Sequence, residues 1–185
     1  MKKSEYGYIK SEKKKKVLIT LLYVVIGVAI FLTGYFLNNR SKSNVFTVVS
    51  VLLVLPAAKY VVGFIVLAPF HTIAKEEYEK LTEPFAEEDT VFSDYVFTSA
   101  EKVMGLSCLV LSAGNAIGLT ANAKQDISYI NKYLKDGIRK VSPEYKVKIV
   151  SDEKEFHRLY KKRIASDITE NQQKAVEDWL RSLAV

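Results

Sequence analysis

Four polar side chains between positions 94 and 102 have the chemistry of a catalytic site. Ser99 and Lys102 are three residues apart, a spacing at which a lysine on the next helical turn can activate a serine nucleophile. Asp94 and Glu101 add two carboxylates to this polar cluster, which lies beside the end of a predicted strand. Asp94, Ser99, Glu101 and Lys102 are therefore one candidate site, although Ser99 is also placed to cap a short helical turn.

The segment Ser99-Ala100-Glu101-Lys102 is similar to the Ser-x-x-Lys motif of penicillin-binding proteins. That family also uses a Lys-Thr-Gly motif, which this sequence lacks, and its fold needs a longer chain. We therefore favour the capping role for Ser99.

The sequence predicts no metal or cofactor site. His71 and His157 are far apart, and no cluster has metal-ligand spacing. Gly114 and Gly118 lack the third glycine and the Lys-Ser/Thr ending of a phosphate loop. The single cysteine, Cys108, lies in an apolar run, so we expect a buried thiol on a reducing side of a membrane rather than a nucleophile.

A basic cluster occupies one predicted helix near the C-terminus. Its members are Arg158, Lys161, Lys162 and Arg163. They form either a solvated face or a contact surface for anionic lipid headgroups. Nucleic acid is not an expected partner, because residues 70–185 carry 17 basic and 19 acidic side chains.

Two apolar stretches determine where these groups are located. Residues 17–37 have no charged side chain and residues 45–69 have only Lys59, and about 20 apolar residues suffice to cross a bilayer. The predicted organisation is a basic flank (1–16), transmembrane helix 1 (17–37), a connector (38–44), transmembrane helix 2 (45–69) and an α+β domain (70–185).

Charge predicts the orientation of this hairpin. Seven lysines precede the first span, against Arg40 and Lys42 in the connector. The positive-inside rule then places both termini in the cytoplasm and the connector outside, in the plasma membrane. Tyr6 and Tyr8 suit the aromatic belt at the membrane interface.

Within the spans, Lys59 is the candidate functional residue. It lies near the bilayer centre unless the second span is short or tilted, in which case it reaches water. A buried lysine needs a partner, which a second copy of the hairpin could supply. Gly27 and Gly34, seven residues apart, favour close packing between helices.

Periodicity predicts a mixed domain in the order α-β-β-β-α-β-α-α. The predicted elements are a helix at 72–81, strands at 91–98, 106–111 and 116–120, a helix at 122–141, a strand at 145–149 and two helices opened by Asp152 and Thr169.

The helix–three strands–helix–strand order resembles the core of restriction-endonuclease-like (PD-(D/E)xK) nucleases. The resemblance covers residues 72–150 and concerns element order alone. It implies an acidic residue on the second strand and a Glu-x-Lys on the third, which would hold a divalent metal. Neither strand contains a carboxylate, so the resemblance implies at most a catalytically silent relative.

These observations favour a two-pass membrane protein whose cytoplasmic domain is a non-catalytic binding or regulatory module. The expected partners are the bilayer and a protein partner or a second copy. The alternatives are a membrane-anchored enzyme, with a degenerate nuclease-like core or a site around Asp94, and a function within the membrane centred on Lys59.

Overall fold

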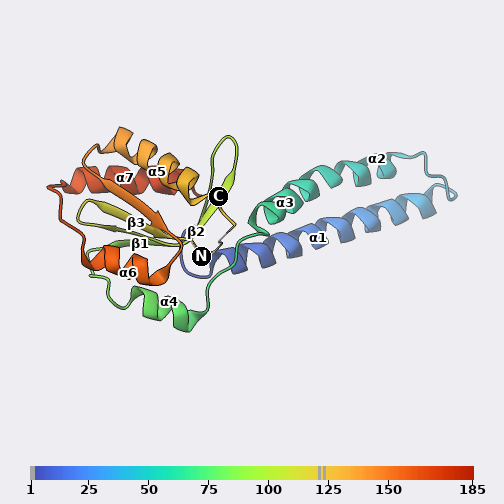
Figure 1. The fold of residues 1–185 in the computed structure, drawn as a ribbon. Helices are drawn as coiled ribbons and strands as arrows, with labels where there is room; N and C mark the ends of the chain where they lie inside the picture. Colours follow the sequence, from blue (N-terminus) through green and yellow to red (C-terminus); the bar gives the residue numbers. More distant parts are fainter. Residues whose placement is uncertain (1–2, 121, 123) are drawn as a thin grey trace. The chain divides into compact units, whose positions relative to one another are not determined.

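The computed structural model describes residues 3–120, 122 and 124–185, which form two units (Figure 1). One unit is Lys10–Pro69. The other combines the residues up to Ile9 with Phe70–Val185, so that both ends of the chain belong to it.

The first unit is a hairpin of helices. These helices are α1 (Tyr8–Leu37), α2 (Val45–Leu52) and α3 (Val54–Leu67). Both α1 and the α2–α3 stretch are long and apolar enough to cross a membrane. Helix α1 starts before the predicted span because its lysine-rich flank is helical too. There Glu12 pairs with Lys15 at 3.6 Å and with Lys16 at 3.8 Å.

The second apolar stretch is helical over Val45–Leu67, within the predicted range 45–69, with one irregular position at Leu53. Leu53 forms a turn between α2 and α3. Pro56 has no N–H to donate to the carbonyl of Leu52, and its ring crowds that carbonyl. The helix is therefore locally irregular one turn before the proline, although Leu53 still donates its N–H to the carbonyl of Val49 at 3.3 Å.

Small residues bring the two arms of the hairpin together. A Cβ atom on Gly34 would collide with the side chain of Phe46, and one on Gly27 would lie 3.7 Å from the carbonyl oxygen of Ser50. Gly27 and Gly34 thus both face the second arm, as their spacing predicts.

The second unit contains a four-stranded mixed sheet in the order β1-β2-β3-β4. Its elements are α4 (Lys75–Thr82), β1 (Thr90–Thr98), β2 (Val103–Ser112), β3 (Asn115–Leu119), α5 (Ile127–Val141), β4 (Lys146–Val150), α6 (Glu153–Lys161) and α7 (Glu170–Leu183). Strands β1 to β3 are antiparallel, and α5 carries the chain to β4, which is parallel to β3. The α+β class and the element order agree with the prediction.

Helices cover both faces of the sheet (Figure 1). Helices α5 and α7 cover one face, and α4 and α6 cover the other. Alternate residues of β2 enter opposite cores. Leu109 is buried with Leu134 of α5, and Val110 is buried with Phe156 of α6.

Both ends of the chain cover the edge strand β1. Ser93 donates its N–H to the carbonyl of Ser4 at 2.9 Å, and Val185 donates to the carbonyl of Val96 at 3.0 Å. An uncovered edge strand is a template for pairing with other chains, so these contacts complete the sheet. We call residues 3–9 the N-terminal strap; the sequence predicts them only as part of the basic flank 1–16.

Candidate functional site

The four predicted site residues lie in two separate environments. Asp94 is buried within β1, whereas Ser99, Glu101 and Lys102 lie in the turn between β1 and β2. Among the described residues, no hydrogen bond or ion pair joins Asp94 to the other three. The structure therefore brings Ser99 close to Lys102 but does not bring Asp94 to them.

Asp94 binds the start of α1. Its Oδ2 accepts hydrogen bonds from the Thr72 hydroxyl (2.6 Å) and the Ile9 N–H (3.3 Å). Burial raises the pKa of the Asp94 carboxyl, although bonds from Thr72 and from the backbone of Ile9 and Gly7 oppose that rise. Because Ile9 lies in the first turn of α1, Asp94 satisfies a helix N–H as an N-cap residue does.

The backbone of Asp94 is also unusual. Its φ angle is 50°, in the left-handed region that aspartate tolerates better than most residues. The paired residues on either side of it are Ser93 and Tyr95, so the β1–β2 ladder is interrupted there. The side chain is 1% exposed, which leaves it no access to a substrate in solution.

Two tyrosines hold the rest of the strap on the domain. The ring of Tyr6 stacks on Tyr78, with centroids 4.3 Å apart, and its hydroxyl donates to the carbonyl of Ile73 at 3.0 Å. The Tyr8 hydroxyl donates to the carbonyl of Val185 at 3.0 Å. The sequence assigns both tyrosines to a membrane interface, and the structure shows what they bind within the domain.

Ser99 stabilises the turn between β1 and β2. Its hydroxyl accepts hydrogen bonds from the N–H groups of Glu101 (3.2 Å) and Lys102 (3.0 Å). The helical turn predicted at residues 99–102, all of which are described, is therefore wrong. The same serine chemistry that caps helices here satisfies the N–H groups of a hairpin turn.

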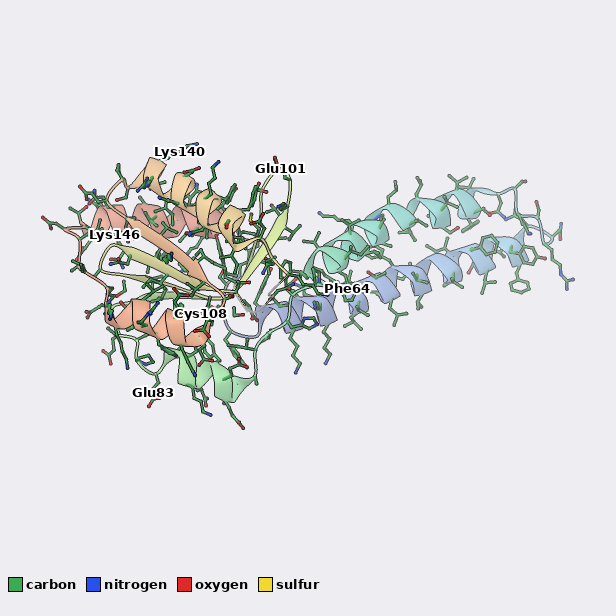
Figure 2. The ribbon with its side chains drawn as sticks, viewed as in Figure 1. Phe64, Glu83, Glu101, Cys108, Lys140 and Lys146 are labelled. Carbon is green, nitrogen blue, oxygen red and sulfur yellow. The ribbon has the colours of Figure 1, made fainter. Side chains whose placement is uncertain are left out.

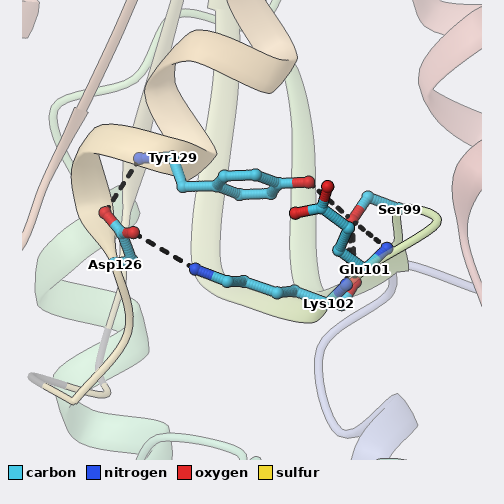
Figure 3. A network of polar contacts seen from close by, with 5 residues as sticks. All are labelled: Ser99, Glu101, Lys102, Asp126 and Tyr129. Carbon is cyan, nitrogen blue, oxygen red and sulfur yellow. Dashed lines mark hydrogen bonds and ion pairs between the residues drawn. The ribbon is translucent and has the colours of Figure 1, made fainter.

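Figure 3 shows how this turn is tied to the start of α5. The Lys102 ammonium lies 3.2 Å from Asp126 Oδ2 and 4.6 Å from the centre of the Tyr129 ring. The Tyr129 hydroxyl lies 3.0 Å from Ser99 Oγ. The Lys102 ammonium thus binds Asp126, and Ser99 contacts only the backbone of Lys102. Among the described residues, Ser99 therefore has no neighbouring side-chain base to accept its proton.

Asp126 and Tyr129 were not predicted as members of this network. Asp126 is the N-cap of α5 and accepts the N–H of Tyr129 at 3.0 Å. That bond, together with Lys102, lowers the pKa of the Asp126 carboxyl. The signal was an aspartate directly before an apolar stripe, but the predicted helix began earlier, at position 122. The adjacent Ala123 lies outside the described residues.

Cys108 is a core thiol, as expected. It is fully buried on the α6 side of the sheet (Figure 2), and burial raises its pKa to about 12. A thiol with that pKa is protonated at neutral pH and is a poor nucleophile.

The two strands that would carry nuclease chemistry are apolar. Strand β2 reads VMGLSCLVLS and β3 reads NAIGL, and neither contains an acidic residue. Within the described ranges, no group of three His, Cys, Asp or Glu residues could hold a metal ion. The predicted element order is present, but β2 and β3 lack the acidic residues that the resemblance implies for a metal site.

A basic groove of about 780 Å³ lies between α4 and α6. Its basic side chains are Lys80, Lys154, Arg158, Lys161 and Lys162. Glu83 and His157 also line it. The groove therefore has a strong excess of positive charge and suits an anionic ligand.

Three of the four predicted lipid-contact residues line this groove. The fourth, Arg163, stacks on the ring of Tyr160 at 3.9 Å and donates to its carbonyl at 2.9 Å. Lys154 was missed, although it lies one turn before Arg158 on the same helix. Lys80 comes from another helix, so only the tertiary structure could reveal it.

Lys59 lies on α3 with an exposed side chain. Within the described part of the hairpin, it forms no hydrogen bond or ion pair. Tyr60, the next residue, stacks its ring on that of Tyr23 in the other arm, with centroids 5.9 Å apart.

No protein-family model, curated protein or solved structure matches this chain.

Proposed function

We propose that the chain is a two-pass protein of the plasma membrane whose C-terminal domain is a non-catalytic binding or regulatory module. In this proposal α1 and the α2–α3 stretch are the membrane spans. The connector at 38–44 is outside, and both termini and the domain are cytoplasmic.

The observation that carries the proposal is the packing of the N-terminal strap within the C-terminal domain. The strap comes just before the first apolar helix, and Phe70 comes just after the second. Since both segments belong to one folded unit, the two flanks of the hairpin belong on the same side of a membrane. Two attachment points and short connections keep the domain near the bilayer surface.

A binding role is favoured over catalysis by the surroundings of the polar candidates. Asp94 is buried under the strap, and Ser99 and Lys102 are engaged in the turn network. An enzyme built on these residues would need them in one accessible cleft. The basic groove, by contrast, is accessible and lined by charged groups.

Cysteine labelling in intact cells tests the proposed topology. Ser43 and Ser182 are exposed, and each is replaced by cysteine in a Cys108→Ala background. A membrane-impermeant thiol reagent should label Ser43→Cys but not Ser182→Cys, whereas permeabilised cells should show labelling of both. Labelling of Ser182→Cys in intact cells would show that the orientation is the reverse of the proposed one. Labelling of neither variant in intact cells would refute the external location of the connector.

A further inference from the structure

We infer that the groove between α4 and α6 binds the phosphate groups of anionic lipids in the membrane that anchors the chain. The inference rests on the proposed function for the location of the domain, and it adds the class of ligand.

Most of the basic side chains that line the groove have no acidic partner among the described residues. Lys80, Lys154, Lys161 and Lys162 form no ion pair with any acidic residue in the part of the chain that the structure describes. Arg158 lies 3.4 Å from Glu155 in an exposed pair, which is weakly stabilising. Five basic side chains outnumber Glu83 in the lining of the groove, so they repel one another, and an anion in the groove would relieve that repulsion.

Helix stability explains only part of this arrangement. Lysines in the last turn of a helix complement the helix dipole, which accounts for Lys161 of α6 and for Lys80 of α4. Lys154 lies in the first turn of α6, where a positive charge is unfavourable. Lys80 approaches the same groove from α4. An anionic ligand in the groove would offset the unfavourable position of Lys154 and would be shared with Lys80 and Lys161.

Chain length favours a lipid as the source of the phosphate. Residues 68–74 separate the end of α3 from the start of α4, and seven extended residues span at most about 25 Å. This length limits how far the start of α4 can be from the membrane surface at which the second apolar helix is proposed to end. Headgroups of that bilayer are present at high effective concentration, so modest affinity is sufficient.

Lysine footprinting of the full chain in nanodiscs tests this inference. The rate of amine modification at Lys80 and Lys154 is measured in phosphatidylcholine alone and with phosphatidylglycerol added. A third arm uses phosphatidylcholine nanodiscs with glycerol phosphate in solution. Phosphatidylglycerol should slow modification of both lysines by about fivefold, the factor that one basic side chain gains near an anionic surface.

Two variants with the same loss of charge distinguish binding in the groove from general attraction of basic side chains to an anionic membrane. Arg158→Gln/Lys161→Gln/Lys162→Gln should abolish the protection of Lys80 and Lys154. The control variant Lys132→Gln/Lys135→Gln/Lys140→Gln removes the same charge from the exposed side of α5. It should leave the protection of Lys80 and Lys154 intact. Lys140 of α5 and Glu83 of the groove lie on opposite sides of the sheet (Figure 2).

The inference is overturned if phosphatidylglycerol protects neither lysine, or if both variants behave alike. Equal protection by glycerol phosphate would assign the groove to a free phosphate compound instead of a lipid. The proposed function fails separately, through labelling of Ser182→Cys in intact cells, because the nanodisc measurement does not depend on orientation in a cell.

Discussion

The carboxylate of Asp94 accepts a hydrogen bond from the backbone N–H of Ile9, 85 positions earlier in the chain, at 3.3 Å. The same oxygen accepts the Thr72 hydroxyl at 2.6 Å. Ile9 precedes the first apolar stretch and Thr72 follows the second. One buried side chain therefore binds both of the segments that flank the helical hairpin.

Asp94→Ala should destabilise the domain more than Asp94→Asn. Alanine leaves the Thr72 hydroxyl and the Ile9 N–H without their acceptor, which costs roughly 1–3 kcal/mol for a buried group. Asparagine keeps an acceptor oxygen in place. Denaturant unfolding of the full chain in detergent measures both, and equal stability of wild type and Asp94→Ala would show that these bonds contribute nothing.

The same position should make stability depend on pH. Burial raises the pKa of Asp94, so the folded state favours its protonated form. Its contribution to the free energy of unfolding is then greatest below the unfolded pKa of about 3.9 and decreases as pH rises through the folded value. Asp94→Asn should therefore gain stability relative to wild type as pH rises through that interval. Parallel pH profiles for the two proteins would contradict this.

The α5 side of the domain could be predicted from sequence because its signal is local. Ile130, Leu134 and Ile138 recur at helical spacing, and all three are buried. The alternation of Lys146 to Ile149 likewise predicted β4. Such patterns report which face of one element is apolar, and this information was sufficient for the element order.

The strap and the groove could not be predicted in the same way, because their partners are distant in sequence. Residues 3–9 have no apolar periodicity, and their acceptor, Asp94, is marked only as a polar residue in a strand. In this lysine-rich flank the sequence signals for a folded segment were Gly7 and the two tyrosines beside it. In the structure Gly7 adopts a φ of 83°. The groove required Lys80 and Lys154 to meet from two helices.

Gly34→Ala should disrupt the helical hairpin, whereas Gly27→Ala should be tolerated. A methyl group at Gly34 would overlap the Phe46 side chain, but one at Gly27 would make an ordinary contact with Ser50. Cysteine cross-linking between the two arms, in a Cys108→Ala background, measures their proximity. Cross-linking should fall in Gly34→Ala and persist in Gly27→Ala; equal yields would mean that close approach at Gly34 is not required.

Lys59→Leu should leave membrane insertion intact but reduce self-association. Lys59 lies ten positions before Pro69, so its Cα is about 15 Å from that end of an untilted helix. A lysine this deep costs on the order of 2.5–3.5 kcal/mol unless it is paired or hydrated, and the described part of its own hairpin gives it no partner. A second copy of the hairpin could bind the ammonium, and leucine would remove that interaction. Single-molecule photobleaching in nanodiscs counts the copies, with Lys42→Leu in the connector as a control of equal charge change. An unchanged copy number in Lys59→Leu would indicate instead that the second helix is tilted or short and that Lys59 reaches interfacial water.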